Sequence, residues 1–214
     1  MVTGASDGIG KQYARQLAKE GFKIALMARD MTKLEQVAAE IESELKVKTK
    51  IIVYDFAKLA TQQSVDELEA LLKVELADID QLSILVNNVG CSKAALLGKH
   101  TPADAMRLIN VNINSQVYMT RLLLPRLLAR QSRSALINTA SRSALVPSGF
   151  TPIYCATKSF NLSFSQCMLD AHSDKIDVLT VTPHFTKTGL MPGGQCWAVS
   201  AERHAKATFN QLGW

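Results

Sequence analysis

The chain has 214 residues, of which 47% are hydrophobic and 20% are charged, and its formal net charge is +5. This length predicts one domain over residues 1–214, and this composition is that of an ordinary globular protein. The basic residues are spread along the chain, which argues against nucleic-acid binding and suits an anionic cofactor, an anionic substrate or a membrane surface. No run of about 18 apolar residues is present, so we expect no membrane span in this chain.

Neither the cysteines nor the densest basic cluster predicts a site. The cysteines lack the spacing of metal ligands, so we expect free thiols and no metal: Cys91, Cys155, Cys167 and Cys196. The basic cluster is interpreted as the solvated side of a helix and the loop after it: Arg121, Arg126, Arg130 and Arg133.

The first ten residues contain a glycine-rich turn. Gly4, Gly8 and Gly10 have the spacing TGxxxGxG and lead into a helical pattern that begins at Ile9. Glycine lets the backbone turn tightly and approach a ligand, and the N–H groups at a helix N-terminus attract a pyrophosphate. The sequence therefore predicts a dinucleotide-binding turn, and the alternative is a glycine-rich turn without a ligand. Only residues 1–3 precede Gly4, so we expect the chain to begin inside the first strand.

Beyond this turn, buried strands alternate with helices. Apolar runs predict strands at residues 23–28, 50–55, 82–90, 135–139 and 177–182. Helical periodicity predicts helices at residues 31–45, 61–74, 103–129, 152–171 and 201–212. Together with the short first strand, this alternation predicts an α/β fold with a parallel, doubly wound sheet of Rossmann type. We expect part of the first strand and the last strand of a complete fold to be missing.

Charged residues follow the second and third strands. Arg29 suits the 2′-phosphate of NADP(H), whereas an acidic residue there would suit the 2′-hydroxyl of NAD; the alternative is an exposed arginine without a ligand. Asp30 is expected to cap the next helix. Asp55 is placed either against the adenine or in a plain turn or cap.

Asparagines mark the fourth strand and the long helix after it. We expect Asn87 to satisfy neighbouring backbone groups, and residues 88–90 to pass beside the cofactor. Within helix 103–129, asparagines are costly, so we expect a buried water or a backbone contact at Asn110, Asn112 and Asn114. Pro125 is expected to kink this helix near its end.

A serine, a tyrosine and a lysine follow the fifth strand. Tyr154 and Lys158 share one face of the next helix, and Ser141 lies just past the strand's C-terminal end. These groups would meet at the edge of the sheet where ligands bind in such folds. An ammonium favours the phenolate and lowers the pKa of the phenol, so the trio suits proton delivery to a carbonyl that receives a hydride. The alternative is a chance pair on a solvated helix face.

In this order, the glycine turn, residues 87–90, Asn112, Ser141 and Tyr154-x-x-x-Lys158 resemble the short-chain dehydrogenase/reductase family over nearly the whole chain. Several segments are similar to its very-long-chain 3-oxoacyl-CoA reductase and 17β-hydroxysteroid dehydrogenase branch: SDGIGKQYARQLAKEGF, VYDF, IYCATKSFNLSFSQC and Pro183-His-Phe. Arg142 departs from this branch, which commonly shows glycine after the catalytic serine.

The resemblance implies an NADPH-dependent oxidoreductase that reduces a lipid ketone. The implied substrate is the 3-keto group of a long-chain 3-oxoacyl-CoA in fatty-acid elongation, on the cytosolic face of the endoplasmic reticulum. The alternatives are a 17β-hydroxysteroid dehydrogenase and a non-catalytic NADPH-binding protein of the same fold. The implied catalytic residues are Asn112, Ser141, Tyr154 and Lys158. The implied NADP(H)-binding residues are Gly4, Ser6, Gly8, Ile9, Gly10, Arg29, Asp55, Asn88, Gly90, Tyr154, Lys158, Phe185 and Thr188.

The resemblance also implies individual roles. Tyr154 would donate the proton, and Ser141 would orient the carbonyl oxygen. Lys158 would hold the nicotinamide ribose and depress the pKa of the tyrosine, and Asn112 would fix a water that connects the lysine to solvent.

Subunits of the resembled family pair through helices 103–129 and 152–171, so a homodimer is expected. Phe160, Phe164 and Met168 lie at helical spacing and are interpreted as core rather than interface. The apolar loop 189–199 is expected either to cover an apolar substrate or to pack on its own core.

Overall fold

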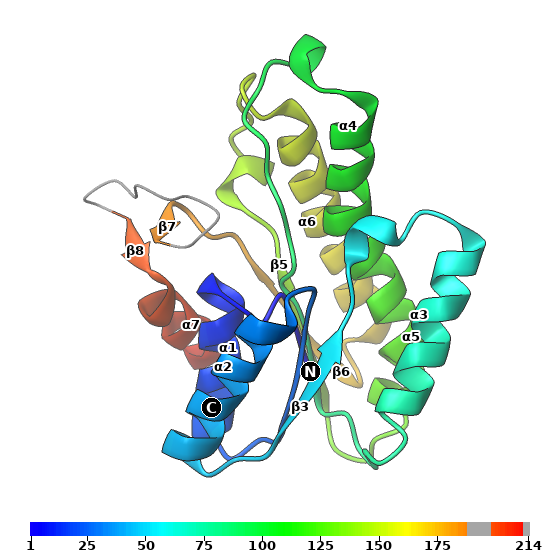
Figure 1. Ribbon diagram of the computed structural model, residues 1–214, viewed down its shortest axis with the longest axis vertical. Coiled ribbons are helices and arrows are strands. Elements are labelled where there is room, and N and C mark those ends of the chain that lie inside the picture. Colours follow the sequence, from blue (N-terminus) through cyan, green and yellow to red (C-terminus); the bar gives the residue numbers. More distant parts are fainter. Residues whose placement is uncertain (188–197, 212–214) are drawn as a thin grey trace.

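Six parallel strands form the central sheet, in the spatial order β3-β2-β1-β4-β5-β6 (Figure 1). The computed structural model describes residues 1–187 and 198–211. The strands are β1 (Val2–Thr3), β2 (Ile24–Ala28), β3 (Thr49–Val53), β4 (Ile84–Asn87), β5 (Ser134–Thr139) and β6 (Ile176–Val181). All five neighbouring pairs are parallel, so the predicted doubly wound α/β sheet is confirmed.

Helices cover both faces of this sheet. They are α1 (Gly8–Lys19), α2 (Met31–Leu45), α3 (Gln62–Glu75), α4 (Pro102–Ile109), α5 (Ser115–Leu128), α6 (Pro152–His172) and α7 (Ala201–Asn210). Apolar side chains of α1, α2 and α7 pack on one face, and those of α3 and α5 pack on the other. Side-chain caps start several of these helices, and Asp30 caps α2 by accepting a hydrogen bond from the Lys33 N–H (3.1 Å), as predicted.

The strand order reverses at the centre of the sheet. Strand β1 pairs with β2 on one side and with β4 on the other, and the chain crosses from β3 to β4 between these pairings. Open α/β sheets bind ligands outside the carboxyl ends of their strands at such a switch point. The loops after β1, β4 and β5 therefore build the site.

The prediction of a single α-helix over residues 103–129 is wrong, because a π-helix (η3, Asn110–Asn114) separates α4 from α5. The asparagines explain the change. Asn110 Nδ2 donates to the Ala57 carbonyl (3.0 Å) and Asn114 Nδ2 donates to the Leu59 carbonyl (2.8 Å). These bonds to a neighbouring loop are the backbone contacts expected from the sequence.

Two further expectations need correction, and one small sheet was not predicted. Asn87 does not satisfy backbone groups, because its Nδ2 donates to the side chains of Thr120 and Asn138 (both 2.9 Å). Phe160 is not core: it is 37% exposed and stacks on the half-buried Phe164, with ring centroids 5.9 Å apart. A small second sheet, β7 (Thr186–Lys187) with β8 (Val199–Ser200), was not predicted.

The basic cluster is only partly solvated. The half-buried Arg126 donates to the carbonyls of Leu76 and Ile79, whereas Arg130 Nη1 donates to the Arg133 carbonyl (2.6 Å). These bonds tie loops together at the amino ends of the strands, because a long guanidinium side chain can reach several carbonyls at once.

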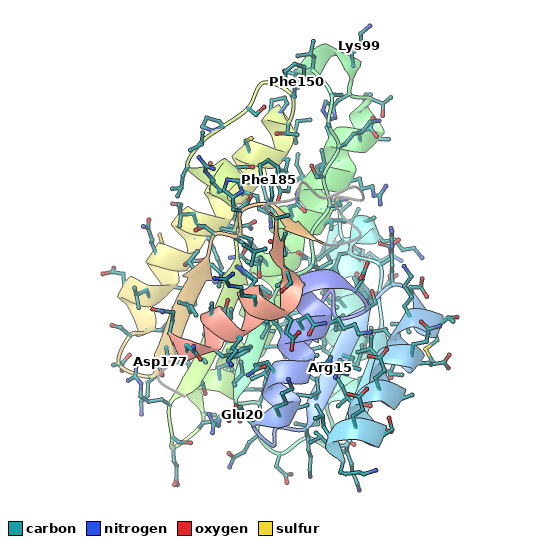
Figure 2. The ribbon with its side chains drawn as sticks, turned by 90° about the vertical axis from the view of Figure 1, so that its left-hand side faces the viewer. Arg15, Glu20, Lys99, Phe150, Asp177 and Phe185 are labelled. Carbon is teal, nitrogen blue, oxygen red and sulfur yellow. The ribbon has the colours of Figure 1, made fainter. Side chains whose placement is uncertain are left out.

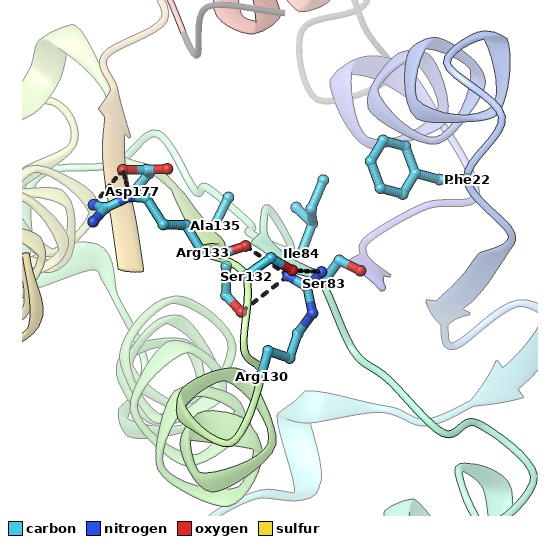
Figure 3. A pocket seen from close by; sticks show the side chains of 9 residues that line it. Phe22, Ser83, Ile84, Arg130, Ser132, Arg133, Ala135 and Asp177 are labelled. Carbon is cyan, nitrogen blue, oxygen red and sulfur yellow. Dashed lines mark hydrogen bonds and ion pairs between the residues drawn. The ribbon is translucent and has the colours of Figure 1, made fainter. Parts of the chain in front are cut away.

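A hollow of about 280 Å³ lies at the same end of the sheet. Figure 3 shows the Arg133–Asp177 ion pair (2.6 Å) on one side of it and Phe22 on the other. Its arginines donate to groups of the protein itself, and it lies at the end of the strands opposite the switch-point loops. We therefore interpret the hollow as a gap between loops that are held together by hydrogen bonds and an ion pair of the protein itself.

Candidate active site

The turn between β1 and α1 is packed so closely that only glycine fits at two of its positions. Gly4 has φ +65°, a left-handed conformation that strains other residues. A Cβ on the buried Gly10 would lie 2.2 Å from the Gly4 carbonyl oxygen. Asn88 Nδ2 donates to the carbonyls of Thr3 (3.1 Å) and Gly4 (3.4 Å), which ties the turn to the end of β4.

This turn fits the pyrophosphate of a dinucleotide. The missing Cβ atoms let the turn pack against itself and against residues 88–89, and α1 begins directly after Asp7, whose carboxylate accepts from the Gly8 N–H (2.6 Å). Ser6 and Ile9 are half-buried beside the turn. The residues predicted for this part of the cofactor thus lie together at the switch point.

Asn112 is held rigidly inside the π-helix. Its Oδ1 accepts from the Cys91 N–H (2.8 Å), and its Nδ2 donates to the Cys91 carbonyl (2.9 Å) and to Thr157 Oγ1 (3.0 Å). The backbone carbonyl of Asn112 accepts from Nδ2 of the buried Asn161 (2.8 Å). This network joins the loop after β4 to helix α6, which carries Tyr154.

Lys158 is the buried charged group of the site. It is only 4% exposed, and its Nζ donates to the Thr139 carbonyl at the end of β5 (2.8 Å). The same Nζ lies 5.9 Å from the centre of the Tyr154 ring. A Cβ on Gly90 would lie 3.5 Å from Lys158 Nζ and 3.4 Å from Asn112 Oδ1, so Gly90 lies beside both side chains.

Ser141 completes the predicted trio. It is buried just past β5, and its Oγ accepts from the Ser143 N–H (3.1 Å), which starts the short 3₁₀-helix η4 (Arg142–Ala144). Its side chain also lies close enough to the Tyr154 phenol to lower the pKa of that phenol by a hydrogen-bonding interaction. The structure thus brings Ser141, Tyr154, Lys158 and Asn112 together at the carboxyl end of the sheet.

The expected depression of the tyrosine pKa is not found. Burial raises the pKa of Tyr154 above its usual value, and the hydrogen bond with Ser141 offsets this only in part. Burial also lowers the pKa of Lys158 to about 8. The reason is that each group is removed from water, which disfavours its charged form more than contacts with the rest of the protein stabilise it.

Comparison with known proteins identifies the family. Residues 1–194 match the family described as short chain dehydrogenase. The chain belongs to the short-chain dehydrogenase family. It is 39% identical over 195 residues to the very-long-chain 3-oxoacyl-CoA reductase of Homo sapiens. The matched region covers 89% of this chain. The chain spans 60% of the length of that relative.

Solved structures of short-chain dehydrogenases share the fold. A short-chain dehydrogenase from Sphingobium yanoikuyae in complex with NADPH has a TM-score of 0.87 and 26% identity, covering 99% of this chain and 83% of that chain. A 3-ketoacyl-(acyl-carrier-protein) reductase from Brucella melitensis complexed with NADH has a TM-score of 0.82 and 27% identity, covering 96% and 86%. These structures hold different nicotinamide cofactors.

Three of the remaining predicted cofactor residues lie in the segments after β2, β3 and β6. Arg29 is exposed just past β2, and Asp55 caps the 3₁₀-helix η1 (Phe56–Lys58) by accepting from the Ala57 N–H (3.0 Å). Phe185 is half-buried with its ring 4.6 Å from that of His184. Thr188 and most of the apolar loop lie outside the described residues.

Four supporting residues were missed from the sequence: Thr3, Cys91, Thr157 and Asn161. Thr3 Oγ1 accepts from the N–H groups of Asn88 (3.0 Å) and Val89 (3.2 Å). A signal existed for two of the others, since Thr157 and Asn161 lie three residues after Tyr154 and Lys158 respectively, on the same helix face. A buried helix face with several polar residues indicates a hydrogen-bond network.

Replacement of Lys158 by methionine is expected to change how stability depends on pH. Below pH 8 the lysine is protonated in both the folded and the unfolded protein. Between pH 8 and 10.5 it is protonated in the unfolded protein but loses its proton in the folded protein. Because the unfolded protein binds more protons in this range, the wild-type free energy of unfolding rises with pH. At about 1.4 kcal/mol per unit, the wild type should gain about 3 kcal/mol relative to Lys158→Met over this range. Urea unfolding of the cofactor-free proteins measures this difference, and parallel pH curves for the two proteins would contradict the buried charge.

Proposed function

We propose that this chain is an NADPH-dependent ketoreductase that reduces the 3-keto group of a long-chain 3-oxoacyl-CoA in fatty-acid elongation. The observation that carries the proposal is the meeting of Ser141, Tyr154 and Lys158 beside a glycine turn shaped for a dinucleotide. The relative named very-long-chain 3-oxoacyl-CoA reductase supports the substrate. Location at the cytosolic face of the endoplasmic reticulum is part of the same proposal.

The cofactor would be held by four parts of the chain. The glycine turn and the first N–H groups of α1 bind the pyrophosphate, and the exposed guanidinium of Arg29 binds the 2′-phosphate. Asn88 and Asp55 flank the adenosine, and Lys158 holds the nicotinamide ribose. When bound, NADPH supplies a hydride.

The protein supplies the proton and the orientation. Burial keeps Tyr154 Oη protonated at neutral pH, so the phenol is ready to donate to the carbonyl oxygen. Ser141 Oγ lies in hydrogen-bond contact with this phenol and orients the same oxygen. Lys158 and Asn112 both lie beside Gly90. There they support the return of a proton from solvent to Tyr154.

The test is oxidation of NADPH by the purified chain in the presence of a 3-oxoacyl-CoA, followed by loss of NADPH absorbance. A panel with steroid ketones separates the two lipid substrates. Salt should raise the KM for the CoA thioester more than that for a steroid, because only the thioester carries phosphates. A chain that binds NADPH yet turns over no ketone would be the non-catalytic protein instead.

Replacement of Arg29 by serine is expected to weaken NADPH binding roughly ten- to a hundredfold, because a charge-assisted bond to the 2′-phosphate is lost. NADH lacks this phosphate, so its binding should change little. Fluorescence titration with both cofactors measures the effect, and Lys73→Ala, on an exposed position of α3, controls for the loss of one positive charge. Equal losses for NADPH and NADH would contradict the role of Arg29.

We also propose that the chain forms a homodimer in which α6 contributes to the interface. The exposed Phe160 and its stacked neighbour Phe164 are apolar groups that a second subunit would cover. Light scattering tests this, and a monomeric mass would refute it.

A further inference from the structure

The most exposed apolar side chains of the described residues gather on two loops. Five of the six most exposed large hydrophobic residues lie there, with exposures from 55% to 69%: Leu96, Leu97, Leu145, Val146 and Phe150. We call these five residues the apolar tip. Large apolar groups that are exposed together on neighbouring loops mark an interaction surface more often than singly scattered ones.

The two loops are fixed to each other and to the fold. The Ala95 N–H donates to the Phe150 carbonyl (2.8 Å), which joins the loops directly. Ser159 Oγ of α6 donates to the Ala144 carbonyl (3.1 Å), next to Leu145. Figure 2 shows Phe150 and Lys99 close together at one end of the molecule, beyond Phe185. These hydrogen bonds therefore fix the two loops that carry the apolar tip to each other and to α6.

Cationic residues lie in the same two chain segments as the apolar tip. Segments 91–107 and 141–151 contain four lysine or arginine residues and one acidic residue: Lys93, Lys99, Arg107, Arg142 and Asp104. Lys93 pairs with Asp104 (2.6 Å). Arg142 bonds His184. The two segments thus combine exposed apolar groups with a net charge of +3, from four cationic residues minus one acidic residue, which suits an anionic lipid surface with an apolar interior.

The same loops border the candidate active site. Arg142 directly follows Ser141, and Phe150 lies four residues before Tyr154. Cys91, at the start of the other loop, bonds the side chain of Asn112. The two loops that carry the apolar tip therefore begin or end at residues of the site.

We propose that the apolar tip docks on the surface of a bilayer that contains anionic phospholipids. Leucine and phenylalanine side chains on the loop ends enter the headgroup region, and the lysine and arginine side chains bind lipid phosphates around them. Docking in this orientation turns the mouth of the site toward the membrane. A lipid ketone would then pass from the bilayer to Ser141 and Tyr154; this last step rests on the proposed ketoreductase function, whereas the docking itself does not.

Co-sedimentation with vesicles tests the docking. Wild type should bind vesicles of phosphatidylcholine with phosphatidylserine, and Leu97→Ser/Phe150→Ser should lower the partition coefficient roughly tenfold or more, because two large apolar groups are removed. Val74→Ser is the matched control, since Val74 is 72% exposed on α3, away from both loops. Lys99→Glu and added salt should weaken binding to the anionic vesicles only.

Several outcomes would overturn docking: no binding by the wild type, an equal loss in Val74→Ser, or a tip variant that changes the mass in light scattering instead. The last result would assign the tip to a protein contact. Reduction of a water-soluble ketone by Leu97→Ser/Phe150→Ser should match the wild type. Vesicle binding without any ketone reduction would refute the proposed function alone, and ketone reduction without vesicle binding would refute the docking alone.

Discussion

Replacement of Tyr154 by phenylalanine is expected to slow ketone reduction by about 10²–10⁴-fold, the usual contribution of general acid catalysis. The ring remains, and Lys158 keeps its bond to the Thr139 carbonyl, so NADPH binding should change little. Only the proton donor and its hydrogen bond with Ser141 are lost. Single-turnover oxidation of bound NADPH measures the rate of the chemical step directly.

Tyr118→Phe is the matched control, because Tyr118 is half-buried on α5 and packs against the core rather than the site. It should reduce the ketone at the wild-type rate. Full turnover by Tyr154→Phe would show that another group donates the proton, even if the fold and cofactor binding were unchanged.

The sheet was predictable because each strand is a short apolar run and each run ends in polar residues. In a parallel sheet covered on both faces, buried strands read as nearly continuous hydrophobic segments, and β2 is buried at all five positions. The same regularity placed Gly4, Asn88 and Ser141 after β1, β4 and β5, which are neighbours in the sheet. Since the carboxyl ends of parallel strands share one edge, their meeting followed from the pattern alone.

The π-helix and its network were not predictable, because they depend on contacts between distant segments. Asn110 bonds the Ala57 carbonyl, and Asn161 bonds the Asn112 carbonyl across 49 positions in the sequence. Local periodicity reads the region as one amphipathic helix, and tertiary hydrogen bonds override it.

The direction of the pKa shifts in the site could not be predicted from the sequence for a similar reason. A lysine near a tyrosine suggests a depressed phenol pKa, but the outcome depends on how deeply each group is buried. Here burial dominates for both Tyr154 and Lys158. Likewise, helical spacing could not distinguish the exposed Phe160 from a core residue, because the neighbour on that face was unknown.

Replacement of Gly10 by alanine is expected to destroy NADPH binding and to destabilise the chain by about 1–3 kcal/mol, the usual cost of overpacking. The new Cβ would lie 2.2 Å from the Gly4 carbonyl oxygen and 2.4 Å from Asn88 Nδ2. Neither atom can move away easily. Asn88 Nδ2 donates to the Thr3 carbonyl, and the N–H of Ala5, which follows Gly4, donates to the Met27 carbonyl in β2 (3.3 Å). NADPH fluorescence titration and urea unfolding measure the two effects.

Gly98→Ala is the control for this change. A Cβ on Gly98 would meet nothing within 4 Å, so the same substitution should leave stability within about 0.5 kcal/mol of the wild type. Because Gly98 is not among the residues proposed to hold the cofactor, NADPH binding should also be unchanged. Wild-type NADPH affinity in Gly10→Ala would contradict the central inference about this turn: that its backbone must pack without side chains so that a pyrophosphate can reach the N-terminus of α1.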